Sequence, residues 1–324
     1  MTSTPSAGRP SRDAPRVTVA AVFGGYALCF LILVLFLHQR PVARAPEVAP
    51  TPTQADFPAP PPGAVVFSRE AGPNALALAV APRGGKVLVQ ASVVGPDGAG
   101  VPDATTHFVV AGSQATGSPC GAGCYRASLP TRGRPRAVEF VAEGPVSARW
   151  HVVLPSSWPA ADATSMLSDA RRAWRALRSL SFTERLASDE SHVVTSTWRV
   201  QAPDRLVYQI AHGDAAVIIG KRRWDRSPGD RWRRSSQFPL TQPTPPWAAA
   251  TNARVLDTTT LRGRPAWRIS FFDPKTPGWF TVVVDRETLR TLDLRMVATA
   301  HFMHDVYGSF DAAPEIRAPP AAPR

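Results

Sequence analysis

The longest unbroken apolar stretch lies near the N-terminus, where residues 17–37 (VTVAAVFGGYALCFLILVLFL) contain no charged side chain. As a helix rising about 1.5 Å per residue, this stretch is about 31 Å long, close to the ~30 Å hydrocarbon core of a membrane. We predict an uncleaved single membrane span. The alternative, a cleaved signal peptide, has a shorter apolar region of about 7–15 residues. The excess of Arg in residues 1–16 predicts a cytoplasmic N-terminal tail and an extracytoplasmic body.

Residues 38–62 lack a periodic apolar pattern and are rich in proline. Such a segment favours extended polyproline II, which rises about 3.1 Å per residue. We predict a linker here that separates the membrane span from the folded body, and a disordered tail over residues 319–324.

Short apolar runs separated by turn sequences follow in residues 63–155. The turn signals include Gly72-Pro73-Asn74 and Gly95-Pro96-Asp97-Gly98, where Gly and Pro favour chain reversal. About seven short strands in a segment of this length are typical of a small antiparallel β-sandwich. The predicted strands are residues 65–67, 75–80, 87–94, 106–110, 124–127, 137–141 and 148–153.

Residues 158–318 are predicted to begin with a helix and to continue almost entirely as strands. Apolar residues from Met166 to Leu180 recur every three or four positions, and Asp162 or Thr164 can cap this helix. The proline-rich residues 239–250 interrupt the strands and are predicted to hold a short helix or a lid. The predicted strands are residues 181–186, 192–201, 205–210, 215–220, 232–237, 253–260, 266–272, 279–285, 291–298 and 301–310, with four short strands over residues 197–232.

The net charge of +12 indicates an anionic partner. Only Lys86, Lys221 and Lys275 are lysines among the 37 basic residues, and this preference for Arg is also typical of a GC-rich genome. The charge is densest in one predicted hairpin, which also carries Trp224 and Trp232. Its basic residues are Lys221, Arg222, Arg223, Arg226, Arg231, Arg233 and Arg234.

This hairpin has two interpretations. It can be an exposed sheet edge, with Arg side chains pointing outward and Trp side chains inward, that charge protects from aggregation. Alternatively, its Arg side chains can contact anionic lipid headgroups. Nucleic acid is not an expected partner of an exported domain.

Cys120 and Cys124 lie close together in the sequence CGAGC. In an exported domain such a pair most often forms a disulfide, and Gly121 and Gly123 permit so small a loop. Free thiols and a metal site are the alternatives.

His301, Met303 and His304 are residue types that can ligate copper. On a regular strand His301 and Met303 share one face while His304 points to the other, so the three cannot converge without a bulge. No sequence motif of a known catalytic site is present, so we expect neither an enzyme nor a cofactor.

Several segments of residues 158–318 together resemble the LolA-like group of lipoprotein carriers. These are ARRAWRALRSLSFTERLAS, STWRVQAPDRLVYQI, GKRRWDRSPGDRW and FFDPKTPGWFTVVVDRETLRTLDL. The resemblance implies a half-barrel, an antiparallel meander wrapped on a helix, that encloses an apolar cavity for acyl chains. The sequence pattern of a filled core is nearly the same as that of a hollow one. The residues expected to line the cavity are Trp174, Leu177, Trp198, Tyr208, Ile218, Trp247, Trp267, Phe271 and Phe280.

The stretches GPNALALAV, VLVQASVVGPDGAGVPDATTHFVV and GAGCYRASLPTRGRPRAVEFV in residues 63–155 resemble the Ig-like domains of the YtkA/FixH-like group, which are attached to copper-transport membrane proteins. The domain has His107 and His151 but no Met, whereas soft copper sites use Cys, Met and His.

These patterns predict a mainly β chain with one transmembrane helix, an Ig-like β-sandwich and an α+β LolA-like half-barrel. The expected function is a single-pass cell-membrane protein whose exported body binds lipid or lipoprotein acyl chains without catalysis. The alternative is a cargo-free sensing or scaffold module in the cell envelope, linked to copper handling or to a membrane-protein partner.

Overall fold

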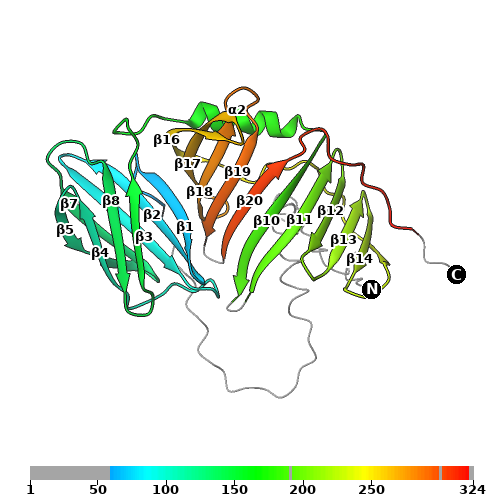
Figure 1. The fold of residues 1–324 in the computed structure, drawn as a ribbon, viewed down its shortest axis with the longest axis horizontal. Coiled ribbons are helices and arrows are strands. Elements are labelled where there is room, and N and C mark those ends of the chain that lie inside the picture. Colours follow the sequence, from blue (N-terminus) through cyan, green and yellow to red (C-terminus); the bar gives the residue numbers. More distant parts are fainter. Residues whose placement is uncertain (1–58, 190–191, 299–300, 321–324) are drawn as a thin grey trace, which may run out of the picture. The chain divides into compact units, whose positions relative to one another are not determined.

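A computed structural model describes residues 59–189, 192–298 and 301–320, which form a mainly β structure with one short α-helix (Figure 1). The predicted tail and span of residues 1–37, and most of the predicted linker, lie outside these residues. Within the described ranges, no helix is both long enough and apolar enough to cross a membrane.

The first described domain is a sandwich of two antiparallel sheets, as the spacing of the apolar runs predicts. The sheets share one core in which the rings of Phe108 and Phe140 lie 5.4 Å apart. That the sandwich is of the Ig-like type remains a prediction. One sheet has the order β1 (Val65–Ala71), β2 (Asn74–Arg83), β3 (Lys86–Val94), β7 (Cys124–Pro130), β6 (Ser118–Gly121), and the other β5 (Ser113–Thr116), β4 (Thr105–Val110), β8 (Ala137–Glu143), β9 (Ala148–Val153).

Two strands of the sandwich, β5 and β6, have no counterpart in the prediction. Their side chains are exposed or half-buried, so no apolar alternation marks them. Gly117 lies between them, and a Cβ at this position would come 2.2 Å from the Thr106 hydroxyl. The chain passes here from one sheet to the other, and only glycine permits so close an approach to Thr106.

The second domain is built on one antiparallel sheet of 11 strands. β10 pairs with both β11 and β20, so the first and last strands of the domain are neighbours in the middle of the sheet (Figure 1). Its order is β15 (Arg233–Ser236), β14 (Arg222–Arg226), β13 (Ala215–Ile219), β12 (Arg205–Ile210), β11 (His192–Gln201), β10 (Ser179–Asp189), β20 (His301–Gly308), β19 (Thr291–Ala298), β18 (Gly278–Asp285), β17 (Arg264–Asp273), β16 (Thr251–Leu261).

The helix α2 (Thr164–Arg175) packs on one face of this sheet, where the Trp174 ring meets the Tyr307 ring edge-on at 4.8 Å. We call this the α2 face. The prediction that Asp162 or Thr164 caps this helix is wrong: the N-cap residue is Ala163, which has no side chain that can cap it. Asp162 lies one residue earlier and accepts a hydrogen bond from the Thr164 amide (2.9 Å). The helix is shorter than predicted: Leu177 lies in the turn after it, and Leu180 belongs to β10.

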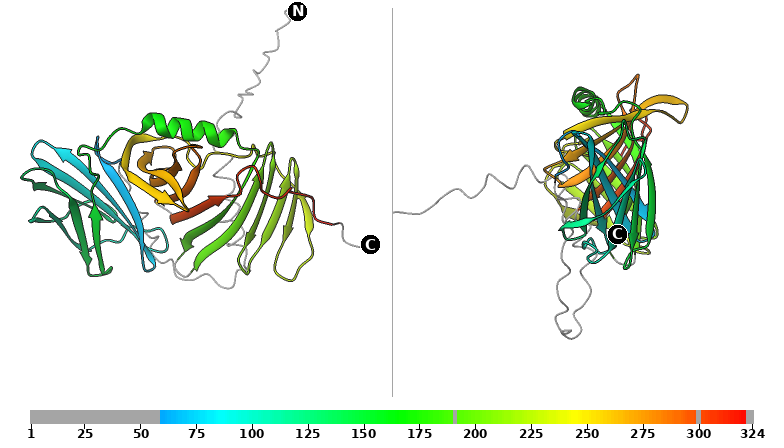
Figure 2. Two further views of the ribbon diagram at one scale, coloured as in Figure 1. Left: turned by 45° about the horizontal axis from the view of Figure 1, so that its top comes forward. Right: turned by 90° about the vertical axis from the view of Figure 1, so that its left-hand side faces the viewer.

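Residues 239–250 cross from β15 to β16 without forming the predicted helix. They cover part of the sheet, because Leu240 and Trp247 are buried and the Trp247 ring lies 5.4 Å from that of Phe271. Figure 2 shows β16–β19 curled beneath α2.

The opposite face of the sheet packs against the sandwich, and we call it the sandwich face. Ala77 and Ala79 of β2 share a buried cluster with Trp279 and Val297 of the large sheet. The Val66 amide also donates a hydrogen bond to the Ser270 hydroxyl (3.1 Å). The two domains therefore share a buried apolar cluster.

Candidate functional site

A row of aromatic rings runs across the α2 face of the large sheet. The registers place Tyr307 opposite Phe182, Phe182 opposite Trp198, and Trp198 opposite Tyr208. The rings of Phe182 and Trp198 stack in parallel at 5.6 Å, and those of Trp198 and Tyr208 lie 4.9 Å apart. Trp174 of α2 adds a fifth ring at Tyr307, so side chains from five elements form one aromatic row.

The row is not equally buried along its length. Trp174, Tyr307 and Tyr208 are buried, whereas Phe182 and Trp198 keep part of their surface exposed. The part of the row that solvent or a ligand can reach is therefore in its middle, on β10 and β11.

The residues predicted to line one cavity fall into separate groups. Trp174, Trp198 and Tyr208 belong to the aromatic row. A second cluster contains Trp247, Phe271 and Phe280, and the last two stack at 5.0 Å. The others lie apart: Leu177 and Ile218 are buried, and Trp267 is half-buried beneath the Arg286 guanidinium at 5.4 Å.

Two carboxyl groups lie beside the aromatic row. Glu184 and Asp305 face each other across β10 and β20. Glu184 accepts hydrogen bonds from the Ser196 hydroxyl (3.0 Å) and the Trp198 indole (2.9 Å). The Tyr307 hydroxyl donates to Asp305 Oδ2 (2.5 Å), whereas Asp305 Oδ1 has no hydrogen-bond partner among the described residues.

Burial raises the pKa of both groups. The pKa of Glu184 is raised mainly because its surroundings favour the neutral form, although its two hydrogen bonds act in the opposite direction. Burial raises the pKa of Asp305 well above its usual range, and the neighbouring Glu184 charge raises it further. Asp305 is only 3% exposed, so it is the member of the pair that retains a proton more readily.

The prediction that the hairpin Arg residues all point outward is wrong for Arg223. Its side chain is on the α2 face and buried, where it pairs with Asp225 (2.6 Å) and reaches the Tyr208 hydroxyl (3.3 Å). Burial is the largest single influence on Arg223 and lowers its pKa, but the hydrogen bonds and charge interactions with Asp225 and Tyr208 together outweigh burial, and the pKa is raised. Burial in turn raises the pKa of Tyr208.

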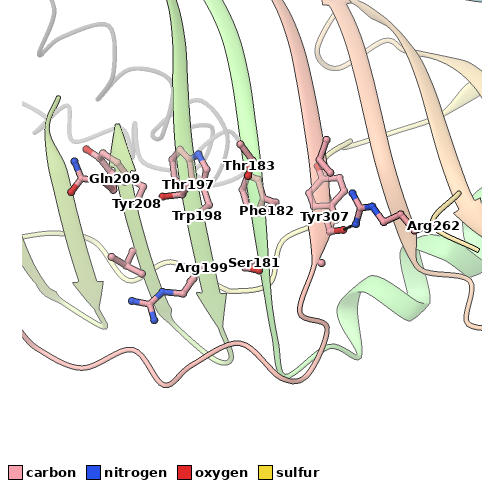
Figure 3. Close-up of a pocket in the computed structure, with 13 residues that line it drawn as sticks. Ser181, Phe182, Thr183, Thr197, Trp198, Arg199, Tyr208, Gln209, Arg262 and Tyr307 are labelled. Atoms are coloured by element: carbon pink, nitrogen blue, oxygen red, sulfur yellow. Dashed lines mark hydrogen bonds between the residues drawn. The ribbon is translucent and has the colours of Figure 1, made fainter. Parts of the chain in front are cut away.

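A groove of about 400 Å³ crosses β20, β10, β11 and β12. Its lining includes Tyr307, Phe182, Trp198 and Tyr208, together with the residues before and after each of them on the strand (Figure 3). The side chains on either side of these positions point to the sandwich face, because successive residues of a strand alternate. Those that line the groove are Ser181, Thr183, Thr197, Arg199, Val207, Gln209 and Val306.

Arg262 reaches this groove from the turn between β16 and β17. Its guanidinium donates to the Tyr307 carbonyl (2.8 Å), as the dashed line in Figure 3 marks. A Cβ on Gly308 would lie 3.9 Å from that guanidinium, which places Arg262 on the sandwich face. The aromatic row and the groove thus lie on opposite faces of the same part of the sheet.

Most of the other hairpin residues are at the surface. Arg222, Arg226, Arg231, Arg233 and Arg234 are exposed, and Trp224 and Trp232 are half-buried. The Arg226 guanidinium lies over the Trp232 ring at 4.7 Å and that of Arg222 over the Trp224 ring at 5.7 Å.

The structure contains a disulfide between Cys120 and Cys124, which joins β6 and β7. Met303 is buried on the α2 face, opposite Met296. His304 points to the other face, where its Nε2 lies 2.8 Å from Asp293. His301 has no described side chain, and the described residues contain no group of three or more His, Cys, Asp or Glu residues that could hold a metal ion.

Five residues of this region were not predicted from the sequence as site residues: Phe182, Glu184, Asp305, Tyr307 and Arg262. Alternation alone places Phe182 and Glu184 on the same face of β10. The pairing of β10 with β20, which brings Tyr307 and Asp305 to them, joins segments more than a hundred residues apart and has no local signal.

No protein-family model and no curated protein sequence matches the chain. The solved structures that it resembles include the lipoprotein LppX of Mycobacterium tuberculosis, with 12% identity over 48% of this chain and 97% of LppX and a TM-score of 0.39. LprF of Mycobacterium bovis gives 11% identity over 49% and 97% of the two chains, with a TM-score of 0.37.

A LolA superfamily protein of Nitrosomonas europaea gives 12% identity over 50% of this chain and 96% of its own, with a TM-score of 0.22. The YtkA/FixH-like resemblance of residues 63–155 has no support from these matches. The solved structures similar to this chain over about half of its length thus include a LolA superfamily protein, as the resemblance in the sequence predicts, at low identity and low TM-score.

Proposed function

We propose that this protein binds an acyl chain, of a lipid or a lipoprotein, against the aromatic row of the α2 face. The observation that carries the proposal is the half-exposed pair Phe182 and Trp198 in the middle of a row whose ends are buried. An acyl chain lying on these rings would remove apolar surface from water, at about 25 cal/mol per Å².

The neighbouring carboxyl groups support an apolar ligand. Because burial raises the pKa of both Glu184 and Asp305, the site favours neutral side chains next to the rings. A neutral carboxyl group costs much less to cover with an acyl chain than a carboxylate does.

A photoreactive fatty acid supplied to cells that express the full chain tests this proposal. We expect mass spectrometry to locate adducts on β10, β11 and β12. The double variant Phe182→Ala/Trp198→Ala should lower the adduct yield at these strands by about tenfold, which corresponds to ~1.4 kcal/mol of binding free energy.

Trp232→Ala is the matched control, because Trp232 is also half-buried but lies outside the aromatic row. Its adduct yield should equal that of the wild type. Adducts confined to residues 17–37, or an equal loss in the control, would contradict acyl-chain binding at the row. Circular dichroism of each variant establishes that the fold is retained.

We also propose that residues 17–37 anchor the body at the outer side of a cell membrane. The support is the length of this uncharged segment, which matches the thickness of the hydrocarbon core. Deleting residues 1–37 from a chain exported by a separate cleavable signal should move the body from the membrane fraction to the soluble fraction. Retention in the membrane would show that the segment is not the main anchor.

A further inference from the structure

The sandwich face of β11–β15 carries arginine side chains without carboxylates among them. The registers place Arg199, Val207, Val217, Trp224 and Arg234 side by side in one row across these strands. A second row holds Thr197, Gln209, Ala215 and Arg226, and a third holds Arg205, Ile219 and Arg222.

Over β10–β15, the described carboxylate side chains of the strands are on the α2 face. These are Glu184 and Asp225, which alternate with the residues of the sandwich face. The nearby Asp204, Asp214 and Asp230 lie in turns, not on the strands. The sandwich face of β11–β15 is therefore uniformly basic.

These arginines have no carboxylate partner among the described residues, apart from Arg205, which lies 3.3 Å from Glu315. Arg222 lies over Trp224, and Arg226 lies over Trp232 and 3.3 Å from the Gln209 amide oxygen. By contrast, arginines elsewhere in the sheet form close ion pairs, such as Arg264 of β17 with Asp285 of β18 (2.5 Å). The charge on this face is therefore available to an external anion.

The groove extends this basic face. It is lined by Arg199 and Arg262 and by the hydroxyl groups of Thr183 and Thr197, and no carboxylate lines it. In Figure 3, Arg262 enters beside Tyr307 while Arg199 extends from β11. We use the term basic face for Arg199, Arg222, Arg226, Arg234 and Arg262.

We propose that the basic face docks on the surface of an anionic membrane. Guanidinium groups are good donors to phosphate oxygens, and the half-buried Trp224 is a side chain suited to the polar–apolar boundary of a bilayer. Phe238, which follows β15, is 83% exposed and can enter that boundary. Spread over several strands, the charges fit an extended anionic surface better than a single small anion.

The proposal is independent of acyl-chain binding, because the basic face and the aromatic row are on opposite sides of the sheet. It revises the expectation that the hairpin alone contacts headgroups. Arg223 is excluded, since it is buried on the other face, and Arg199 and Arg262 are added.

A sedimentation experiment tests whether the basic face docks on a membrane other than the one that holds the chain. The full chain is held in nanodiscs of neutral phosphatidylcholine, which accommodate any apolar segment, and mixed with sucrose-loaded vesicles. We expect sedimentation with vesicles that contain phosphatidylglycerol but not with phosphatidylcholine vesicles. Raising the NaCl concentration to about 0.5 M should abolish it, because the Debye length then falls to well below 10 Å.

The variant Arg199→Gln/Arg222→Gln/Arg226→Gln/Arg234→Gln should lower the vesicle partition coefficient by at least about tenfold. The matched control Arg83→Gln/Arg126→Gln/Arg132→Gln/Arg136→Gln removes the same charge from exposed positions of the sandwich and should stay close to the wild type. Phe238→Ser should weaken binding by the same factor at every NaCl concentration at which binding is measurable, because its contribution is apolar.

Three results would overturn the proposal. One is an equal loss of binding in both quadruple variants, which would mean that only net charge matters. Another is stronger retention on double-stranded DNA of the same charge density than on the vesicles, which would reassign the face to nucleic acid. The third is no sedimentation of the full chain with the phosphatidylglycerol vesicles.

Discussion

At the scale of single residues, the carboxyl pair Glu184 and Asp305 has the least usual environment of the described residues. Both are hydrogen-bonded by aromatic side chains, and both have a raised pKa because burial disfavours their charge. A carboxyl group whose pKa is higher in the folded than in the unfolded state stabilises the fold at low pH. That stability decreases as the pH rises from the unfolded pKa through the folded pKa.

We predict that Asp305→Asn removes the loss of stability that the wild type suffers as Asp305 ionises at higher pH. The asparagine can still accept the hydrogen bond from Tyr307 but cannot ionise. The melting temperature of the variant minus that of the wild type should therefore increase as the pH rises from about 4 to about 8, since only the wild type must bury a charge at the higher pH. Thermal unfolding followed by circular dichroism across this range measures the difference.

Asp257→Asn is a suitable comparison, because Asp257 is an exposed partner of Arg268 on the same sheet. The melting temperature of Asp257→Asn minus that of the wild type should not increase with pH. If the melting-temperature difference between Asp305→Asn and the wild type does not change with pH, the charge of Asp305 does not destabilise the fold.

At the scale of elements, α2 is held to the sheet chiefly through one side chain. The helix buries Leu167, Ala170 and Trp174, and Trp174 is the largest of them and contacts Tyr307. A helix of this length has little stability of its own, so its packing decides whether it forms.

We expect Trp174→Ala to destabilise the domain by about 3–5 kcal/mol, the usual cost of removing a buried tryptophan. The midpoint of urea unfolding should fall, while Arg175→Ala, an exposed position one residue later, should change it by less than about 0.5 kcal/mol. Equal effects of the two substitutions would mean that the Trp174 contact contributes little.

At the scale of the whole molecule, the sandwich and the large sheet share buried contacts. Asn252, just inside β16, joins them with two hydrogen bonds: its Nδ2 donates to the Ala64 carbonyl (2.8 Å) and its Oδ1 accepts from the Gly63 amide (2.9 Å). Asn252 has a φ of +55°, a left-handed conformation that asparagine and glycine adopt more readily than other residues.

Asn252→Gly tests this connection, because glycine tolerates the same φ and removes only the side-chain bonds. We predict a loss of about 1–2 kcal/mol, from two hydrogen bonds of ~0.5–1.5 kcal/mol each that water partly replaces. Calorimetry should also show a broader transition, since the two domains would unfold less cooperatively.

Asn74→Gly is the matched control, since the Asn74 amide makes a single long hydrogen bond (3.5 Å) within its own turn. It should lower stability by less and leave the width of the transition unchanged. If both variants behave alike, the Asn252 bridge does not couple the domains.

Much of the fold could be predicted from local pattern. Each predicted strand overlaps one in the structure, because alternation along β12 or β19 is a property of the segment alone. The predictions were less accurate where local pattern has no information. The exposed strands β5 and β6 were not predicted. The helix was predicted to reach Leu180, because apolar residues continue by chance at a spacing of three or four into the following strand.

Local sequence is enough to predict the order of the elements, their approximate bounds and the concentration of basic residues near Trp224. Which of these residues meet depends on how the strands pair in the folded sheet. The pairing of β10 with β20 brings Glu184 to Asp305 and Phe182 to Tyr307. Strand register likewise sends Arg223 to the buried face and Arg222 to the exposed one. The physical reason is that alternation assigns a residue to one of two faces, whereas its neighbours on that face come from strands distant in sequence, whose pairing depends on the packing of the whole sheet.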